Sequence, residues 1–174
     1  MAKALKPPPR LTVDEWADEI RYLSREASSR PGRWKTSTVE VARGPMRAVN
    51  EKGVHTVTVQ CSTQLLKTEL INNVLGYFVH NDPSPILVVQ PTEKLADAWV
   101  QDRLDKMIRD TPVLNSLFTE KKSRDSANTK NYKSFPGGQI SIVASNSPAN
   151  LAARPIRIVV ADEIDKYPES AGKE

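Results

Sequence analysis

Between Val54 and Ala161, segments with the pattern of β-strands alternate with segments with the pattern of helices. Val54–Gln60 alternates β-branched residues and predicts a strand. Ile86–Gln90 and Ile156–Ala161 are short, mostly apolar segments, which are typical of strands buried on both faces. Because strands that alternate with helices pair in parallel, the pattern favours an α/β fold with a mostly parallel sheet.

The segments between these strands predict helices and one hairpin. Lys67–His80 has apolar residues at helical spacing, and so has the segment from Thr92, the expected N-cap, to Ile108. Phe135–Ser145 contains Gly137-Gly138 followed by alternating apolar residues, and therefore predicts a hairpin.

The N-terminal residues differ from this pattern. Residues 1–10 are basic and proline-rich, which predicts an extended tail. Thr12 and Glu15 have the spacing of a capping box, which predicts a helix that continues through Leu23 and ends at Arg30-Pro31-Gly32. We therefore expect a tail and helix over residues 1–33 and an α/β domain over residues 34–174.

The composition limits the class of protein. The chain has 174 residues, 39% of them hydrophobic and 26% charged, as in a soluble globular domain. Its single cysteine excludes an internal disulfide framework and a cysteine-built zinc site, and no apolar run is long enough to span a membrane. The formal net charge of +4 suits a polyanionic partner, but equally a basic surface without one. We expect a soluble, intracellular protein.

The junction between the first predicted strand and the first helix has the context of a phosphate-binding loop. It reads Cys61-Ser62-Thr63-Gln64-Leu65-Leu66-Lys67-Thr68. In such a loop the backbone N–H groups bind phosphates, Lys67 would neutralise the terminal phosphates, and Thr68 would coordinate Mg²⁺. Cys61 and Leu66 stand where the pattern has glycines, so an ordinary strand-to-helix turn with a surface lysine stays an alternative.

Two adjacent carboxylates, Asp162 and Glu163, follow the last predicted strand. The carboxyl ends of parallel strands form the edge where open α/β sheets bind ligands. There Asp162 would hold Mg²⁺ and Glu163 would orient the water that attacks the γ-phosphate of ATP. A solvated loop that begins with two acidic residues is the alternative. Together with Lys67 and Thr68, the pair favours a site for ATP and Mg²⁺.

Two further features have both a functional and a structural interpretation. Trp34 could pack near an adenine or serve as a core residue. The basic side chains of the loop before the hairpin could contact DNA phosphates or belong to a solvated loop; they are Lys121, Lys122, Arg124, Lys130 and Lys133, with Tyr132 among them.

Three segments in this order resemble the large terminase subunit of tailed bacteriophages, in the lambda-like GpA branch. They read VQCSTQLLKTE, DPSPILVVQPTEKLADAWVQDRLDKMI and NSPANLAARPIRIVVADEIDKYPES. The resemblance implies a three-layer P-loop NTPase-type sheet, incomplete because the chain ends shortly after the Asp162-Glu163 pair. Residues 34–174 would then be a partial ATPase domain, without the C-terminal nuclease of the family.

The resemblance also implies roles for individual residues. The loop in this family commonly reads S-x-Q-x-G-K-T, which Ser62, Gln64, Lys67 and Thr68 match. Leu66 departs from it, and Thr63 stands where other terminase branches have an arginine. The implied phosphate-binding residues are Ser62, Thr63, Gln64, Leu65, Leu66, Lys67 and Thr68, with Thr68 and Asp162 at the metal and Glu163 and Lys67 as catalytic residues.

The activity implied by the resemblance is that of a DNA-packaging motor in the host cytoplasm. ATP hydrolysis with Mg²⁺ would drive double-stranded DNA into a capsid. The implied partners are the terminase small subunit, the portal of the procapsid and, in a complete motor, further copies of the same chain. Two alternatives stay open: a superfamily 2 helicase-like ATPase, to whose motifs Pro91-Thr92 is similar, and a degenerate prophage fragment without activity.

Overall fold

The computed structural model describes residues 11–23, 25–26, 28–62, 66–119, 129–147 and 155–169. Its helical elements are α1 (Val13–Ile20), the 3₁₀-helix η2 (Thr36–Ala42), α2 (Arg43–Ala48), α3 (Lys67–His80), α4 (Glu93–Trp99), the π-helix η3 (Val100–Leu104), α5 (Asp105–Asp110), α6 (Pro112–Thr119) and the 3₁₀-helix η4 (Ile164–Lys166). Its strands are β1 (Tyr22–Leu23), β2 (Gly32–Arg33), β3 (Pro85–Gln90), β4 (Tyr132–Phe135), β5 (Gly138–Ala144) and β6 (Ile158–Ala161). Within these ranges, no helix has the length and hydropathy to cross a membrane.

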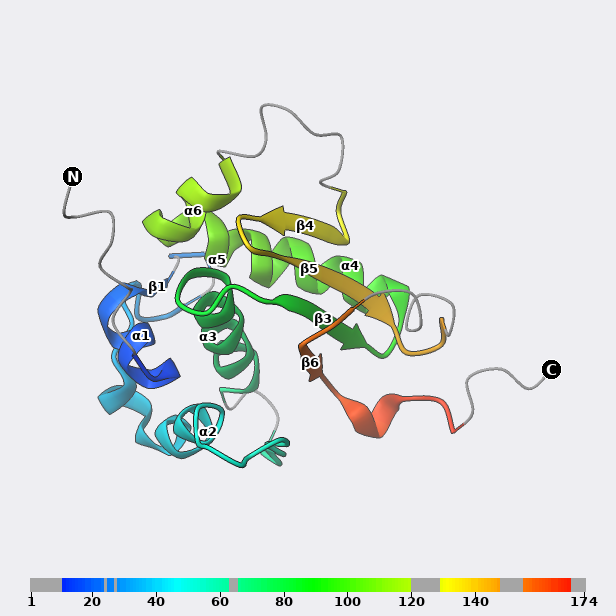
Figure 1. Ribbon diagram of the computed structural model, residues 1–174, viewed down its shortest axis with the longest axis horizontal. Helices are drawn as coiled ribbons and strands as arrows, with labels where there is room; N and C mark the ends of the chain where they lie inside the picture. The colour runs from blue at the N-terminus through cyan, green and yellow to red at the C-terminus, as the bar shows by residue number, and fades with distance from the viewer. Residues whose placement is uncertain are drawn as a thin grey trace.

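The main sheet contains four strands in the order β4-β5-β3-β6 (Figure 1). β3 pairs in parallel with both β5 and β6, with Val88 opposite Ile142 on one side and Val160 on the other. β4 pairs with β5 in antiparallel orientation and forms a hairpin, as predicted, but the hairpin begins at Tyr132, before the predicted Phe135. The structure is therefore an α/β fold with a mixed, mostly parallel sheet, as the alternation of segments predicts.

The two faces of the sheet have different surroundings. Ile86 and Val88 belong to the main core cluster, together with residues of α1, α3, α4 and α6. Val159 of β6 points to the other face and is 62% exposed, so the prediction that this strand is buried on both faces is wrong there. The third layer implied by the family resemblance stays a prediction.

Helix α1 packs against α3 through one large side chain. Trp16 is fully buried, and its indole N–H donates to Nδ1 of His80 at 3.0 Å. The ring lies against Gly76, where an added Cβ would come within 2.1 Å of the Trp16 ring. A residue of the predicted N-terminal segment thus lies in the same core as α3, and the division at residue 33 stays a prediction.

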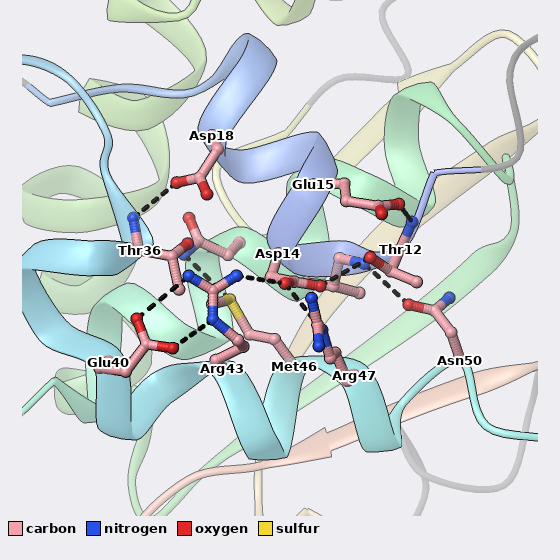
Figure 2. Close-up of polar contacts among 12 residues, drawn as sticks. Thr12, Asp14, Glu15, Asp18, Thr36, Glu40, Arg43, Met46, Arg47 and Asn50 are labelled. Carbon is pink, nitrogen blue, oxygen red and sulfur yellow. Dashed lines mark hydrogen bonds and ion pairs between the residues drawn. The ribbon is translucent and has the colours of Figure 1, made fainter.

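A buried carboxylate joins α1 to α2 (Figure 2). Asp14 is fully buried and accepts hydrogen bonds from Thr12 at 2.6 Å, from Arg43 at 2.9 Å and from Arg47 at 3.0 Å. Burial raises the pKa of Asp14, but these hydrogen bonds outweigh burial and hold it below its usual range. Figure 2 also shows Glu15 closing the predicted capping box, with its carboxylate 2.8 Å from the Thr12 amide.

Two predicted elements are wrong in extent or in kind. Helix α1 ends at Ile20, because Arg21 turns into extended backbone and its carbonyl accepts from the Trp34 amide at 2.9 Å. Residues 54–60 form no strand; Val57 and Val59 are 37% and 40% exposed. Alternating residues indicate that a segment is compatible with a strand. A strand also needs a neighbouring strand that pairs with its backbone N–H and C=O groups.

The remaining elements agree with the sequence. Helix α3 has the predicted bounds, and the Thr92 hydroxyl caps α4 by accepting from the Leu95 amide at 3.2 Å. The helical segment after Thr92 continues as α4, η3 and α5 as far as Asp110, past the predicted Ile108. β6 begins at Ile158, two residues later than predicted.

The contact of Trp16 with Gly76 makes a testable prediction for packing. Gly76→Ala improves the helix propensity of α3 by about 1 kcal/mol. The new Cβ forces the indole ring to move, and overpacking costs about 1–3 kcal/mol. We expect a net loss of unfolding free energy in urea titrations. Gly44→Ala in α2 is the control, because nothing lies within 4 Å of its added Cβ, and it should not destabilise the chain. A Gly76→Ala chain as stable as the parent contradicts the packing.

Candidate functional site

Three parallel strands end at one edge of the sheet, and polar residues follow each of them. β3 ends with Gln90, β5 is followed by Ser145, and β6 is followed by Asp162. The backbone ladder continues through these residues: the Ser145 amide donates to Gln90 at 2.8 Å, and the Asp162 amide donates to Val89 at 3.1 Å. The sheet therefore brings these three side chains to one edge.

The Asp162 carboxylate is nearly buried at this edge, with a residue exposure of 6%. Its Oδ2 accepts a hydrogen bond from the Gln90 amide at 3.3 Å. Its Oδ1 accepts no hydrogen bond from the described part of the chain, and it forms an ion pair with Lys67 Nζ at 3.3 Å. A buried carboxylate oxygen without a hydrogen-bond donor is a candidate ligand for a cation.

Lys67 brings the beginning of α3 to the same place. Its Nζ donates to Glu163 Oε1 at 2.9 Å and pairs with Asp162. Burial lowers the pKa of Lys67, but the hydrogen bond to Glu163 and the charge of Asp162 outweigh burial, and the net pKa is raised. One ammonium group thus bridges two carboxylates from a distant part of the chain, since Glu163 lies 96 positions after Lys67.

Glu163 lies between two lysines. Its second carboxylate oxygen accepts from Lys166 at 2.7 Å, and the hydrogen bonds from Lys166 and Lys67 lower its pKa. Its backbone is left-handed, with φ of 53°. Such a conformation costs a residue with a side chain about 1–2 kcal/mol, so the surrounding contacts hold this turn in place.

Tyr167 holds the turn after Glu163 against the sheet. Its hydroxyl donates to the Val89 carbonyl at 2.8 Å, across from the end of β6. Burial, with a further contribution from the charge of Asp162, raises the pKa of Tyr167 to about 12. The phenol is therefore a neutral hydrogen-bond donor at physiological pH.

The predicted phosphate loop is described only at its two ends. Thr63, Gln64 and Leu65 lie outside the described residues, whereas Ser62 is exposed and Thr68 lies in the first turn of α3. Leu66 has a left-handed backbone, with φ of 58° and ψ of −18°. In the described part of the chain, no hydrogen bond joins the side chain of Ser62 or Thr68 to Lys67, Asp162 or Glu163.

The structure thus unites three of the predicted site residues and adds three that the predicted site did not include. Lys67, Asp162 and Glu163 form one cluster. Gln90, Lys166 and Tyr167 contact it or support it. A polar residue that ends an apolar strand was a usable sequence signal for Gln90, whereas nothing in the pattern singles out Lys166.

A family comparison identifies the class of protein to which this site belongs. Residues 28–174 match the family described as phage terminase large subunit gpA, ATPase domain. The chain belongs to this family. The resemblance inferred from the three motif segments is thereby confirmed.

Terminase large subunits of two phages are similar to this gpA-family chain along nearly all of its length. That of Enterobacteria phage P21 is 28% identical over 170 residues, which cover 96% of this chain and 26% of the relative. That of Escherichia phage lambda is 27% identical over 172 residues, which cover 97% of this chain and 26% of the relative. The chain therefore spans about a quarter of the length of these curated relatives. No solved structure matches it.

The structural interpretation fits Trp34, and two of the five basic residues of the predicted loop have acidic partners, Lys133 from within β4. Trp34 is 4% exposed, belongs to the core cluster and donates to the Thr36 hydroxyl at 2.9 Å. Lys130 pairs with Asp97 at 2.7 Å and Lys133 with Asp105 at 2.8 Å. Lys121, Lys122 and Arg124 lie outside the described residues.

The backbone of Leu66 makes a second testable prediction. Glycine adopts a left-handed conformation without the penalty that a Cβ imposes. Leu66→Gly and Leu66→Ala both remove the side chain that packs against the core, but only Leu66→Gly relieves the backbone. We expect the glycine variant to exceed the alanine variant in unfolding free energy by about 1 kcal/mol. Equal stabilities, measured by urea titration, would contradict a left-handed Leu66.

Proposed function

We propose that this chain is the ATPase portion of a DNA-packaging terminase large subunit, which binds ATP with Mg²⁺ and hydrolyses it to translocate double-stranded DNA. The observation that supports this most is the contact of Lys67 with Asp162 and Glu163. It brings the end of a predicted phosphate loop to the carboxylates at the end of a parallel strand. Ligands bind at that edge in open α/β sheets.

Each residue of the cluster has a proposed task. Lys67 would neutralise the terminal phosphates, and Glu163 would orient the attacking water. Ser62, Thr63, Gln64, Leu65 and Leu66, with the first turn of α3, would supply backbone N–H groups to the phosphates.

The residues present fit a magnesium ion. In the described part of the chain, the buried Oδ1 of Asp162 has the Lys67 ammonium group as its ionic partner, which ATP would draw away, and Thr68 supplies a hydroxyl. Mg²⁺ is commonly held by one or two carboxylates together with substrate phosphates, so Asp162 and Thr68 are a sufficient protein contribution. When bound, the ion neutralises charge that develops on the phosphates.

To bind Lys67, the phosphates of ATP must displace the ion pairs that Lys67 forms with Asp162 and Glu163. Lys67 would leave the two carboxylates for the phosphates, which carry more negative charge. Glu163 would keep the hydrogen bond from Lys166, which holds its carboxylate in place. The lysine thus neutralises the acidic pair before ATP binds and the phosphates afterwards.

The two alternative functions, a helicase-like ATPase and a degenerate fragment, are distinguished by different experiments. A helicase-like ATPase uses the same cluster and is told apart by its DNA substrate. A degenerate fragment would not bind ATP, because the Leu66 side chain stands where the family has glycine. Recovery of ATP binding in Leu66→Gly alone would favour the degenerate fragment.

The remaining functional proposals follow from the family. Relatives of this chain are terminase large subunits. We propose double-stranded phage DNA, the terminase small subunit and the portal of the procapsid as partners, homo-oligomerisation in the complete motor, and action in the host cytoplasm.

Nucleotide binding tests this proposal directly. We expect the chain to bind ATP by isothermal titration calorimetry, more tightly with Mg²⁺ than with EDTA. Lys67→Ala should weaken binding about tenfold or more, because a charge-assisted contact to phosphate is worth about 1.5–3 kcal/mol. Lys52→Ala is the control, because Lys52 is an exposed lysine outside the cluster. An unchanged affinity in Lys67→Ala would refute the assignment of the phosphate loop.

A further inference from the structure

Gln90 is a polar side chain in a position where the sequence pattern expects an apolar one. It ends β3 after four buried apolar residues and is itself 3% exposed. A buried primary amide costs free energy unless its donors and acceptor find partners. Core packing alone therefore does not explain why a glutamine is buried at the sheet edge that carries the acidic cluster.

The side chain of Gln90 has a defined partner on the neighbouring strand. Its Nε2 donates to Asp162 Oδ2 at 3.3 Å, across the parallel pair of β3 and β6. Its backbone is held from the other side, because the Ser145 amide donates to the Gln90 carbonyl at 2.8 Å. The amide group therefore reaches Asp162 from a backbone position that two neighbouring strands determine.

This hydrogen bond distinguishes the two oxygens of the Asp162 carboxylate. With Oδ2 bound to Gln90, Oδ1 is the oxygen that pairs with Lys67. Without the amide, rotation of the carboxylate about its last side-chain bond would exchange the two oxygens, since that torsion has a broad, two-fold potential. The amide thus favours one orientation of a carboxylate that otherwise has two.

We infer that Gln90 is a positioning residue that orients the Asp162 carboxylate, so that Oδ1 faces Lys67 and would be the oxygen available to a magnesium ion bound with ATP. This inference rests on the proposed ATP site and adds a residue to it. Partners that orient a metal-binding carboxylate change metal affinity about 10- to 100-fold when they are removed.

A purely structural amide would behave differently from a positioning residue. Loss of a purely structural hydrogen bond destabilises the whole carboxyl-end edge of the sheet. It therefore weakens ATP binding by the same factor with and without the metal. Ser145 provides a matched control, because its buried hydroxyl donates to the Pro91 carbonyl at 3.0 Å at the same edge. Removal of that hydroxyl perturbs the edge without removing a partner of Asp162.

The test compares ATP affinity with Mg²⁺ and with EDTA by calorimetry, in the 174-residue chain and its Gln90→Leu and Ser145→Ala variants. We expect Gln90→Leu to weaken binding with Mg²⁺ about tenfold and to leave binding with EDTA within about twofold. Ser145→Ala should change both affinities by the same factor. Gln90→Met, which keeps the length of the side chain but has no N–H donor, should reproduce the result of Gln90→Leu.

The outcomes separate this inference from the proposed function. If the parent chain binds ATP with Mg²⁺ and Gln90→Leu loses nothing, or loses equally in Mg²⁺ and EDTA, the positioning role is refuted and the ATP site stands. If the parent chain binds no ATP with Mg²⁺, the proposed function fails, and the role of Gln90 fails with it. Loss of the folded state in both Gln90 variants would show a structural role instead.

Discussion

The candidate site depends on one ionic contact, in which the Lys67 ammonium group bridges the carboxylates of Asp162 and Glu163. This contact joins the beginning of α3 to the end of β6. Through it, the ammonium group at the start of α3 and the carboxylates after β6 lie together in one partly buried site. There, each charged group reduces the free-energy cost of burying the oppositely charged one. The polar groups around the acidic pair, from Gln90, Lys166 and Tyr167, hold the two carboxylates and the turn that carries them.

The position of Lys67 is determined by residues far from it. Helix α3 is fixed at its far end by Trp16, which packs on Gly76, and near its start by Arg21. Arg21 is 2% exposed and donates to Glu69 and to Asn73, both at 2.6 Å. Burial lowers the pKa of Arg21, and the charge of Glu69 opposes that shift. Trp16 and Arg21, which precede the predicted α/β domain, therefore help to support the candidate site. In Figure 1, α1 lies beside α3, on the side of the helix away from β6.

Sequence reasoning succeeded where a pattern has a local physical cause. The bounds of α3, the Thr92 cap and the hairpin at Gly137-Gly138 follow from spacing, capping and turn chemistry. It failed where the outcome depends on a distant partner. Residues 54–60 alternate as a strand does, yet no strand in the described part of the chain pairs with them. The burial of Trp34 and the contact of Gln90 with Asp162 likewise depend on residues that are distant in sequence. The motif pair itself was predictable, because Lys67 begins a predicted helix and Asp162-Glu163 follows a predicted strand, but the contact of Lys67 with the acidic pair is visible only in the fold.

A double-mutant cycle between Lys67 and Glu163 tests the central contact directly, without nucleotide. The single variants Lys67→Met and Glu163→Gln and their combination would be compared in unfolding free energy at low salt. If the ammonium group bridges the acidic pair, the two substitutions couple by about 1 kcal/mol, and added salt reduces the coupling. If the effects add within about 0.3 kcal/mol, the two halves of the site are not joined by this contact, and the ionic bridge is not what holds them together.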